Sequence, residues 1–263
     1  MPPLARPSDM PKKSRAIITL TSDFGLRDHY VAVMKAVLLT ACPDARLIDV
    51  THQVPRHDIL CGSICLERAV SGFPAGTVHL AVIDPGVGTD RRILVAQINR
   101  QIVVCPDNGL ITWAWRTLGG GVAHELTWRP RKSSATFHGR DVMAPAAGRL
   151  AAGEPISSIA RRIDNPILLD ITPAPSRRGE VIHLDHFGNA TTNITIDRLR
   201  SIPVKEIRIR GRRLGALRRT YWDVAPGKPL ALVGSSGLLE IAVRDGDAAR
   251  QLKLKVGDEV VLR

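Results

Sequence analysis

The sequence predicts an α/β protein in two parts: an N-terminal layered α/β domain with a mainly parallel sheet, and a C-terminal β-barrel-like domain. Two observations support this prediction. In the first part, apolar runs rich in β-branched residues alternate with amphipathic stretches of helical period, as in strand–helix–strand units. In the second part, short strand-like runs follow one another with Gly, Pro and Asp turns between them, which is typical of small barrels and sandwiches.

The pattern changes at a proline-containing stretch, residues 171–178, which has two prolines, no periodicity and a basic end. We therefore expect an α/β domain over residues 16–172, a linker over 173–178 and a β domain over 179–263. Residues 1–15 carry prolines and basic side chains without an apolar core. They predict a disordered basic tail, and neither a secretory signal nor a membrane anchor.

Composition is that of a globular protein: 263 residues, 44% hydrophobic and 24% charged, are enough for a sizeable core. No apolar run approaches the roughly 20 residues that cross a bilayer. Cys61 and Cys65 lie one helical turn apart, but no further Cys or His pair completes a ligand set, so we expect no metal. Together with Cys42 and Cys105 they indicate buried free thiols in a cytoplasmic protein.

The net charge of +12 comes mostly from arginine, and an arginine cluster lies between residues 208 and 219. Such a cluster can mark a nucleic-acid surface. However, Ile207-Arg-Ile-Arg210 alternates at the strand period and no aromatic side chains interleave with the arginines. The pattern favours the solvent face of an edge hairpin and argues against nucleic-acid binding as the primary function.

The expected elements of the first part follow in order. They are a strand at 16–21, a helix capped by Asp28 with Val31, Met34, Val37 and Leu38 inward, a strand at 46–50, a helix at 58–70, a strand at 77–83, a hairpin of 92–98 and 101–105 closed by Asn99-Arg100, a helix containing Trp113 and Trp115, and a small-residue helix at 144–152. In the second part, strand-like runs fall at 180–184, 194–196, 205–210, 229–233, 238–243 and 259–262.

Two of the expected strands end in an aspartate followed by a glycine turn. Asp23 follows the first strand, and Asp84 follows the buried run at 77–83 and opens a Pro/Gly loop that ends in Arg91. The carboxyl ends of parallel strands are where open α/β sheets place their ligands. The alternative is an ordinary turn in which Asp84 is held by its own loop amides and Arg91 is solvated.

A second polar cluster, Thr136-Phe-His-Gly-Arg-Asp141, precedes the small-residue helix. His138 beside a glycine is a candidate general base or proton shuttle. The alternative is that His138 caps the helix start or is exposed. In the β half, the segments 185–193 and 234–240 place small polar side chains on turns, and Tyr221-Trp222 offers an aromatic surface; each could also be an ordinary turn or core aromatic.

Eight segments in order resemble the S-adenosylmethionine hydroxide adenosyltransferase (S-adenosylmethionine hydrolase) family, relatives of the fluorinase and chlorinase. The segments are Ser22–Gly25, Asp49–His52, Phe73–His79, Asp84–Arg91, Pro106–Gly109, Thr136–Asp141, Asp185–Asn189 and Ser235–Ile241. The resemblance implies the two domains described above and a homotrimer with active sites between neighbouring subunits. It also implies S-adenosyl-L-methionine as substrate and no separate cofactor.

Within this superfamily, the hydroxide-using members carry an Asp, an Arg seven residues later and a His in the later loop. Asp84, Arg91 and His138 match all three. The resemblance therefore implies attack of an activated water on ribose C5′, giving adenosine and L-methionine. The fluorinase has an aromatic residue at the position of Asp84, which argues against halogenation here.

The resemblance also implies a set of binding residues. These are Asp28 and Asp185 for the methionine ammonium, Ser235 for its carboxylate, Asn189 for the adenine edge, and Phe187 or Tyr221 for stacking. Asp23 is the candidate for the ribose diol, because a carboxylate can accept from two adjacent hydroxyls at once. Ser236 departs from the halogenases, which have an arginine there. Two other functions stay open: a chloride-using halogenase, and a nucleoside- or nucleic-acid-binding protein without turnover.

Overall fold

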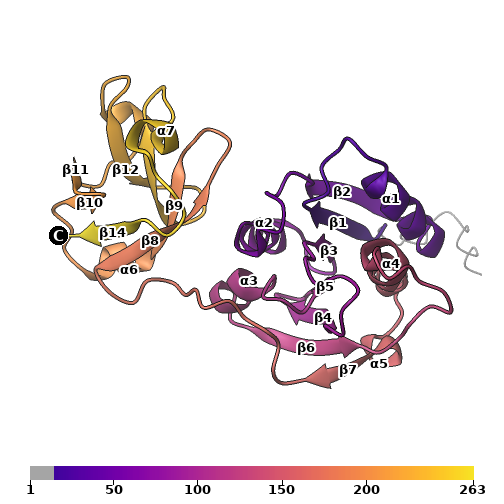
Figure 1. Cartoon of the computed structure of the whole chain (residues 1–263). Helices are drawn as coiled ribbons and strands as arrows, with labels where there is room; N and C mark the ends of the chain where they lie inside the picture. The colour runs from indigo at the N-terminus through magenta and orange to yellow at the C-terminus, as the bar shows by residue number, and fades with distance from the viewer. Residues whose placement is uncertain (1–14) are drawn as a thin grey trace, which may run out of the picture.

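The computed structural model describes residues 15–263, so the expected tail lies, except for Arg15, outside the described residues. The chain forms two sheet-based halves joined by an extended stretch (Figure 1). Within residues 15–263, none of the helices has the length and apolar character needed to cross a bilayer.

The first sheet contains seven strands in the order β2-β1-β3-β5-β4-β6-β7. Their bounds are β1 Ile17–Ser22, β2 Arg46–Thr51, β3 Val78–Val82, β4 Ile93–Ile98, β5 Gln101–Pro106, β6 Gly121–Leu126 and β7 Ala160–Ile163. The pairings β2–β1, β1–β3 and β3–β5 are parallel, whereas β5–β4, β4–β6 and β6–β7 are antiparallel. The α/β class is confirmed, and the sheet is mixed rather than mainly parallel.

The change of direction has a local cause. Asn99 and Arg100 both have positive φ, 48° and 61°, as a two-residue type I′ turn requires. This turn folds β4 back onto β5 as the expected hairpin. β6 and β7, which sequence analysis did not predict, continue the antiparallel half outward from β4.

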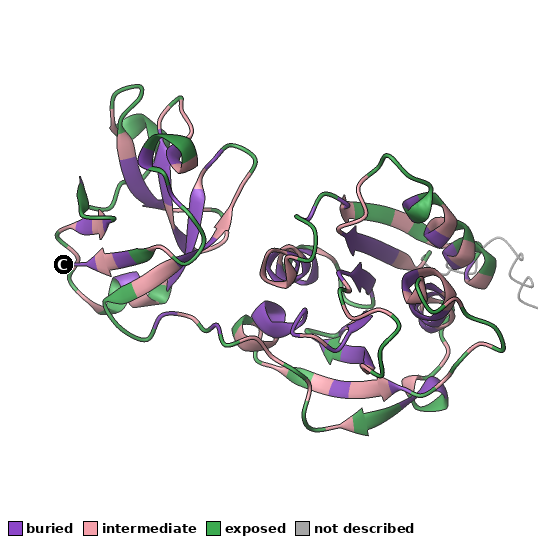
Figure 2. Ribbon diagram, in the orientation of Figure 1, coloured by how far each residue is buried: buried purple, intermediate pink, exposed green. Residues whose placement is uncertain are grey.

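Helices cover both faces of this sheet (Figure 1). On one face, α1 (Tyr30–Ala41) and α4 (Ala144–Ala151) pack on β1 and β3. On the other face lie α2 (Ile59–Gly72) and α3 (Thr112–Thr117). β1 and β3 are almost entirely buried between the two layers (Figure 2). A short helix, α5 (Ile156–Ile159), leads into β7.

The starts of the first two helices differ in how they are capped. The Asp58 carboxylate accepts from the Cys61 backbone N–H at 2.9 Å, a regular N-cap for α2. By contrast, α1 begins at Tyr30 after His29, and no side chain caps it. The prediction that Asp28 caps this helix is wrong, because the chain enters the helix one residue later. Asp28 is exposed and free for another role.

The second sheet is antiparallel throughout, in the order β11-β10-β14-β8-β9-β13-β12. Its strands are β8 Arg178–Leu184, β9 Ala190–Thr195, β10 Ile207–Ile209, β11 Arg212–Gly215, β12 Pro229–Val233, β13 Leu238–Val243 and β14 Glu259–Leu262, with helices α6 Ile196–Ser201 and α7 Ala248–Leu252. After β11, the Arg218 N–H donates to Ala231 O on β12 at 2.8 Å. This bond brings the two edges together, so the sheet is nearly closed and the barrel-like prediction is confirmed.

The arginine cluster lies on and after the β10–β11 hairpin at the sheet edge. Arg208 and Arg213 both contact the Glu206 carboxylate, and Arg210 lies 3.2 Å from Asp258. These arginines are therefore used in ion pairs within the hairpin and its neighbours.

The two halves touch through α2, α3 and the strands β8 and β13. Ile64 and Trp113 pack against Ile182 and Leu238 in one apolar cluster. The stretch expected to be a linker also bonds to the second sheet: the Ala174 N–H donates to Asn193 O at 2.8 Å. This hydrogen bond holds the connecting stretch against the second sheet.

Candidate active site

The ends of β1 and β3 bring two of the candidate carboxylates to one edge of the first sheet. The strands are parallel neighbours, with Ser22 opposite Val82. Asp23 follows Ser22 directly, and Asp84 follows Val82 after one residue. Parallel strands present their carboxyl ends on the same side, so the two aspartates emerge together at the edge where a ligand is expected.

Arg91 folds back over the Pro/Gly loop onto Asp84. Its Nε donates to Asp84 Oδ1 at 2.6 Å, and a terminal nitrogen donates to Oδ2. The two side chains are only 10% and 6% exposed. The alternative of a solvated Arg91 and an Asp84 held by loop amides is therefore wrong: the carboxylate is held by a paired, charge-assisted contact with the guanidinium.

His138 joins this ion pair from a loop 47 residues further on. A terminal nitrogen of Arg91 lies 3.3 Å from His138 Nδ1. Because a guanidinium can only donate, Nδ1 acts as the acceptor and carries no proton in this arrangement. Burial first, and then the positive charge of Arg91, hold the pKa of His138 below its ordinary value of 6.5. The imidazole is neutral at neutral pH.

Close backbone packing docks the two loops on each other. Gly88 has φ +86°, and a Cβ on it would lie 2.8 Å from the Ala135 carbonyl oxygen. His138 itself precedes a π-helical turn, Gly139–Met143, and makes no capping hydrogen bond, so the helix-cap alternative is wrong. Such π turns are frequent at functional sites, and this one leaves the imidazole facing Arg91.

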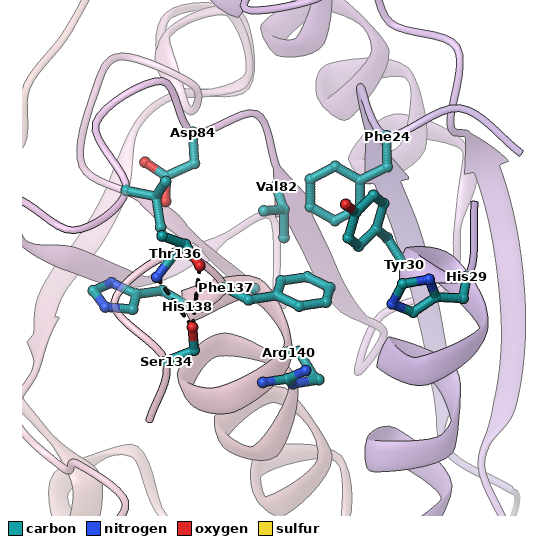
Figure 3. A pocket seen from close by; sticks show the side chains of 12 residues that line it. Phe24, His29, Tyr30, Val82, Asp84, Ser134, Thr136, Phe137, His138 and Arg140 are labelled. Carbon is teal, nitrogen blue, oxygen red and sulfur yellow. Dashed lines mark hydrogen bonds between the residues drawn. The ribbon is translucent and has the colours of Figure 1, made fainter. Parts of the chain in front are cut away.

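Three adjacent hollows surround this arrangement. The first, which we call the aromatic cavity, measures about 470 Å³ and is lined by Phe24, His29, Tyr30, Val82, Asp84, Val87, Ser134, Thr136, Phe137, His138, Gly139 and Arg140. In Figure 3, Asp84 and His138 lie on one side of it and Phe24, Tyr30 and His29 on the other. A second hollow of about 420 Å³, the Asp23 hollow, includes Asp23 and Asp28. A third of about 280 Å³, the junction, includes both Asp23 and Asp84.

Asp23 is held by contacts from the segment after β2. Its Oδ2 accepts from the His57 N–H at 2.9 Å, and His57 has φ +64°. One residue earlier, Ser22 Oγ lies 2.7 Å from His52 Nδ1, and the Gly25 N–H donates to His52 O. The Asp49–His52 motif, to which sequence analysis gave no role, thus anchors the loop that carries Asp23. This role depends on β1 and β2 being neighbours, which single-sequence patterns do not reveal.

The remaining candidates form a separate cluster in the second half. Asp185 accepts from the backbone N–H groups of Phe187 and Asn189, and from Asn189 Nδ2 at 3.1 Å. The Tyr221 hydroxyl donates to Glu240 Oε1 at 2.6 Å. Burial raises the pKa of Glu240. Phe187 is 73% exposed and Ser235 is exposed too.

None of these second-half residues lines the three hollows. The described residues thus divide the candidate site into a first cluster around Asp84 and a second cluster around Asp185 and Tyr221. Sequence analysis missed His57, Tyr30 and Glu240. Glu240 lies within the Ser235–Ile241 motif, so that motif was its available signal. Within residues 15–263, no three His, Cys, Asp or Glu side chains are grouped as a metal ion would require.

Comparisons with known proteins agree with this geometry. Residues 18–160 match the SAM hydroxide adenosyltransferase N-terminal domain, and residues 179–261 match the SAM hydroxide adenosyltransferase C-terminal domain. The chain is 42% identical to an (R)-S-adenosyl-L-methionine hydrolase from Salinispora arenicola, over 92% of this chain and 96% of that protein. It is 43% identical to one from Thermus thermophilus, over 92% and 97%.

A fluorinase from Actinopolyspora mzabensis is more distant, at 27% identity over 94% of this chain and 97% of that one. Among solved structures, an uncharacterized conserved protein from Thermotoga maritima superposes with a TM-score of 0.87 at 38% identity. The match covers 94% of this chain and all of that one.

Proposed function

The chain belongs to the SAM hydroxide adenosyltransferase family, and on this premise we propose that it hydrolyses S-adenosyl-L-methionine to adenosine and L-methionine. The observation that carries the proposal is the contact of Asp84, Arg91 and His138 at the sheet edge, in the residue types of the hydroxide-using enzymes. The relatives at 42% and 43% identity are named for the (R) epimer. We propose the same configuration at sulfur for this substrate.

The reaction needs a nucleophile more than it needs help with the leaving group. Methionine leaves the sulfonium as a neutral thioether, so no proton has to be delivered to it. Water must be placed in line with the C5′–S bond and must lose a proton as it attacks. The Arg91 guanidinium, fixed by Asp84, favours a hydroxide-like oxygen because opposite charge lowers its pKa. Placement beside the substrate removes much of the entropic cost of the encounter.

His138 is the proposed proton acceptor. Its Nδ1 carries no proton while it faces Arg91, and burial keeps the pKa of the ring low, so the ring is a free base at neutral pH. A water that takes the guanidinium's place at Nδ1 meets a nitrogen able to accept its proton. Arg91 then balances the negative charge that remains on oxygen.

The binding roles are proposed as the resemblance implies them. Asp23 accepts hydrogen bonds from the ribose diol, which suits its position in the junction beside Asp84. Asp28, exposed and not used as a helix cap, meets the methionine ammonium from the Asp23 hollow. The second cluster supplies the other contacts: Asp185 to the ammonium, Ser235 to the carboxylate, Asn189 to the adenine edge, and Phe187 or Tyr221 to its face.

We propose a homotrimer in which the second cluster of one subunit completes the first cluster of its neighbour. The supporting observation is that the second cluster stays outside the three hollows of its own chain while Phe187, Tyr221 and Trp222 are exposed on it. We also propose the domain limits 16–172 and 179–263, with 173–178 between them. The cytoplasm is the proposed location, supported by four cysteines that form no disulfide.

Halogenation is not favoured by any contact in the site. A halide approaching C5′ would meet the Asp84 carboxylate, and two negative charges at close range repel. The ion pair with Arg91 reduces this repulsion for any anion, but the neutral His138 imidazole assists only a nucleophile that has a proton to give, which water has and a halide does not.

The test is to incubate the purified protein with each sulfur epimer of S-adenosyl-L-methionine in buffer containing chloride. We expect adenosine and L-methionine from the (R) epimer, and no 5′-chloro-5′-deoxyadenosine. Formation of the chloro product would make the protein a halogenase. Tight binding of adenosine with no turnover of either epimer would make it a nucleoside-binding protein.

A further inference from the structure

The aromatic cavity is much larger than the proposed reaction requires. Hydrolysis consumes one water, whereas the aromatic cavity, which opens to solvent, has a volume of about 470 Å³ and can therefore hold a larger molecule. The residues proposed for the ribose and for the methionine ammonium in the first cluster, Asp23 and Asp28, do not line this cavity. What the aromatic cavity can bind depends on which side of the reacting carbon the cavity lies.

In-line displacement places the nucleophile and the leaving group on opposite sides of C5′. The proposed ammonium partner Asp28 lies in the Asp23 hollow, together with Asp23 but without Asp84 or His138. The junction contains Asp23 and Asp84, so it is the place for the ribose. The aromatic cavity contains Asp84 and His138 but not Asp23. Because Asp84 and His138, the groups that act on the nucleophile, both line the aromatic cavity, we assign this cavity to the nucleophile and the hollow with Asp28 to the leaving methionine.

At the end away from the catalytic group, aromatic rings form much of the cavity wall, together with His29 and with Arg140, whose guanidinium lies 4.8 Å from the Phe137 ring centroid. The rings of Phe24 and Tyr30 each lie within 6 Å of the Phe137 ring, at centroid distances of 5.8 and 5.3 Å. Val82 adds a further apolar side chain to the lining. A molecule that fits this space has a hydroxyl at the His138 end and a short hydrocarbon tail among the rings.

From this arrangement we infer a further activity: the protein transfers the adenosyl group to small primary alcohols held in the aromatic cavity, giving 5′-O-alkyladenosines. The inference rests on the proposed hydrolase function and uses the same catalytic groups. The alcohol oxygen forms the bond to C5′ as the C5′–S bond breaks, and that electron pair stays on the sulfur of methionine. The hydroxyl proton passes to His138 Nδ1 and then to solvent.

An alcohol competes with water for the cavity because its hydrocarbon tail moves out of bulk water into a partly apolar space. Each buried methylene favours occupancy by about fourfold. The ratio of ether to adenosine, at equal alcohol concentrations, should therefore rise by up to that factor per carbon from methanol to 1-butanol. A nucleophile arriving from bulk solvent would show no such rise.

The experiment uses the full chain, the (R) epimer and the series methanol, ethanol, 1-propanol and 1-butanol, with both products measured by mass spectrometry. We expect adenosine in alcohol-free buffer and an ether fraction that increases with chain length. Adenosine without ether, or a flat series, overturns the inference and leaves the hydrolase function intact. Absence of adenosine in alcohol-free buffer removes the proposed function, and the inference with it.

Tyr30 provides a matched pair of variants. It is 40% exposed at the first residue of α1, so its replacement should leave the core intact. Tyr30→Ala removes one apolar wall and should reduce the increment per carbon to less than half of its value in the unmodified protein. Tyr30→Phe keeps the ring and should keep the increment. An unchanged increment in Tyr30→Ala would show that the alcohol is not held in this cavity.

Discussion

The charge state of His138 depends on the few side chains around it. Burial and the Arg91 guanidinium lower the pKa of the imidazole, and Arg129 acts in the same direction; Asp84 and Asp141 act against them. The net result is a ring that stays neutral below its ordinary pKa of 6.5. A general base of this kind keeps the reaction running in mildly acidic solution, and activity falls only when the pH drops through the lowered pKa.

Removal of the imidazole tests its catalytic role. His138→Ala should lower kcat for adenosine formation by about 10²–10⁴, the usual contribution of a general base, with little change in KM. The product is measured by liquid chromatography. His124→Ala serves as control, because His124 lies on β6, three strands away from β3. A rate near that of the unmodified protein in His138→Ala would exclude this residue from the mechanism.

The pKa of His138 can be measured directly by following its imidazole proton resonances during a pH titration. In the unmodified protein we expect the midpoint below 6.5. Arg91→Gln removes a nearby positive charge and leaves Asp84, which favours the protonated ring, so the midpoint should move up. A midpoint that stays in place or moves down would mean that Arg91 does not control the charge of His138.

At the scale of elements, two loops from distant parts of the chain form the reactive centre by resting on each other. Gly88 allows this contact because it has no side chain and adopts a φ that favours glycine. The register of β1 and β3 then places Asp23 beside the same centre. Strand pairing brings the catalytic side chains to the same edge of the sheet, and the contact between the two loops then sets their exact positions.

Gly88→Ala should separate the two loops. Its Cβ would meet the Ala135 carbonyl oxygen at 2.8 Å, and alanine is strained at φ +86°. A displacement of about 1 Å between Arg91 and His138 would lower kcat roughly 10²-fold. Gly86→Ala is the matched control in the same loop, because its Cβ would make ordinary contacts at 3.6 Å.

Both glycine variants should retain the circular dichroism spectrum of the unmodified protein, because each change lies in a loop. Equal activity of Gly88→Ala and Gly86→Ala would show that the docking of the loops is not needed for catalysis.

For the whole molecule, the main consequence of the structure is the separation of the two candidate clusters. The first lies at the edge of the α/β sheet, and the second lies on turns of the near-barrel. If each active site combines the first cluster of one subunit with the second cluster of another, then a single chain holds two incomplete halves. Assembly then becomes a requirement for activity.

Complementation between two inactive variants tests this arrangement. His138→Ala damages only the first cluster, and Asp185→Ala damages only the second. In randomly mixed trimers, about one interface in four joins two undamaged halves, so co-expression should restore roughly a quarter of the original activity. Light scattering should give the mass of three chains. No gain over the separate variants would place both clusters of a site in one chain.

Most elements of the fold could be predicted from local patterns. β-branched runs predicted the buried strands, and Asn99-Arg100 predicted the turn between β4 and β5. β6, β7 and β11 were missed, and β9 begins at Ala190, four residues before the run expected at 194–196. β7 exposes Arg161 and Arg162 at the sheet edge and has no buried alternation. β6 begins directly after a glycine turn, and its residues are only partly buried. Strands of this kind form because they pair with a neighbouring strand, and their composition alone does not predict them.

The sequence by itself determined the residue types at the strand ends, the turn geometry and the two-part order of the chain, because sterics and hydrogen bonds among near neighbours decide these features. Only the tertiary structure decided that Arg91 turns inward onto Asp84, that His138 accepts from it across 47 residues, that His52 anchors the Asp23 loop, and that the second cluster lies elsewhere. Contacts between distant residues depend on which strands become neighbours and how closely their loops approach. Both are set by the packing of the whole chain.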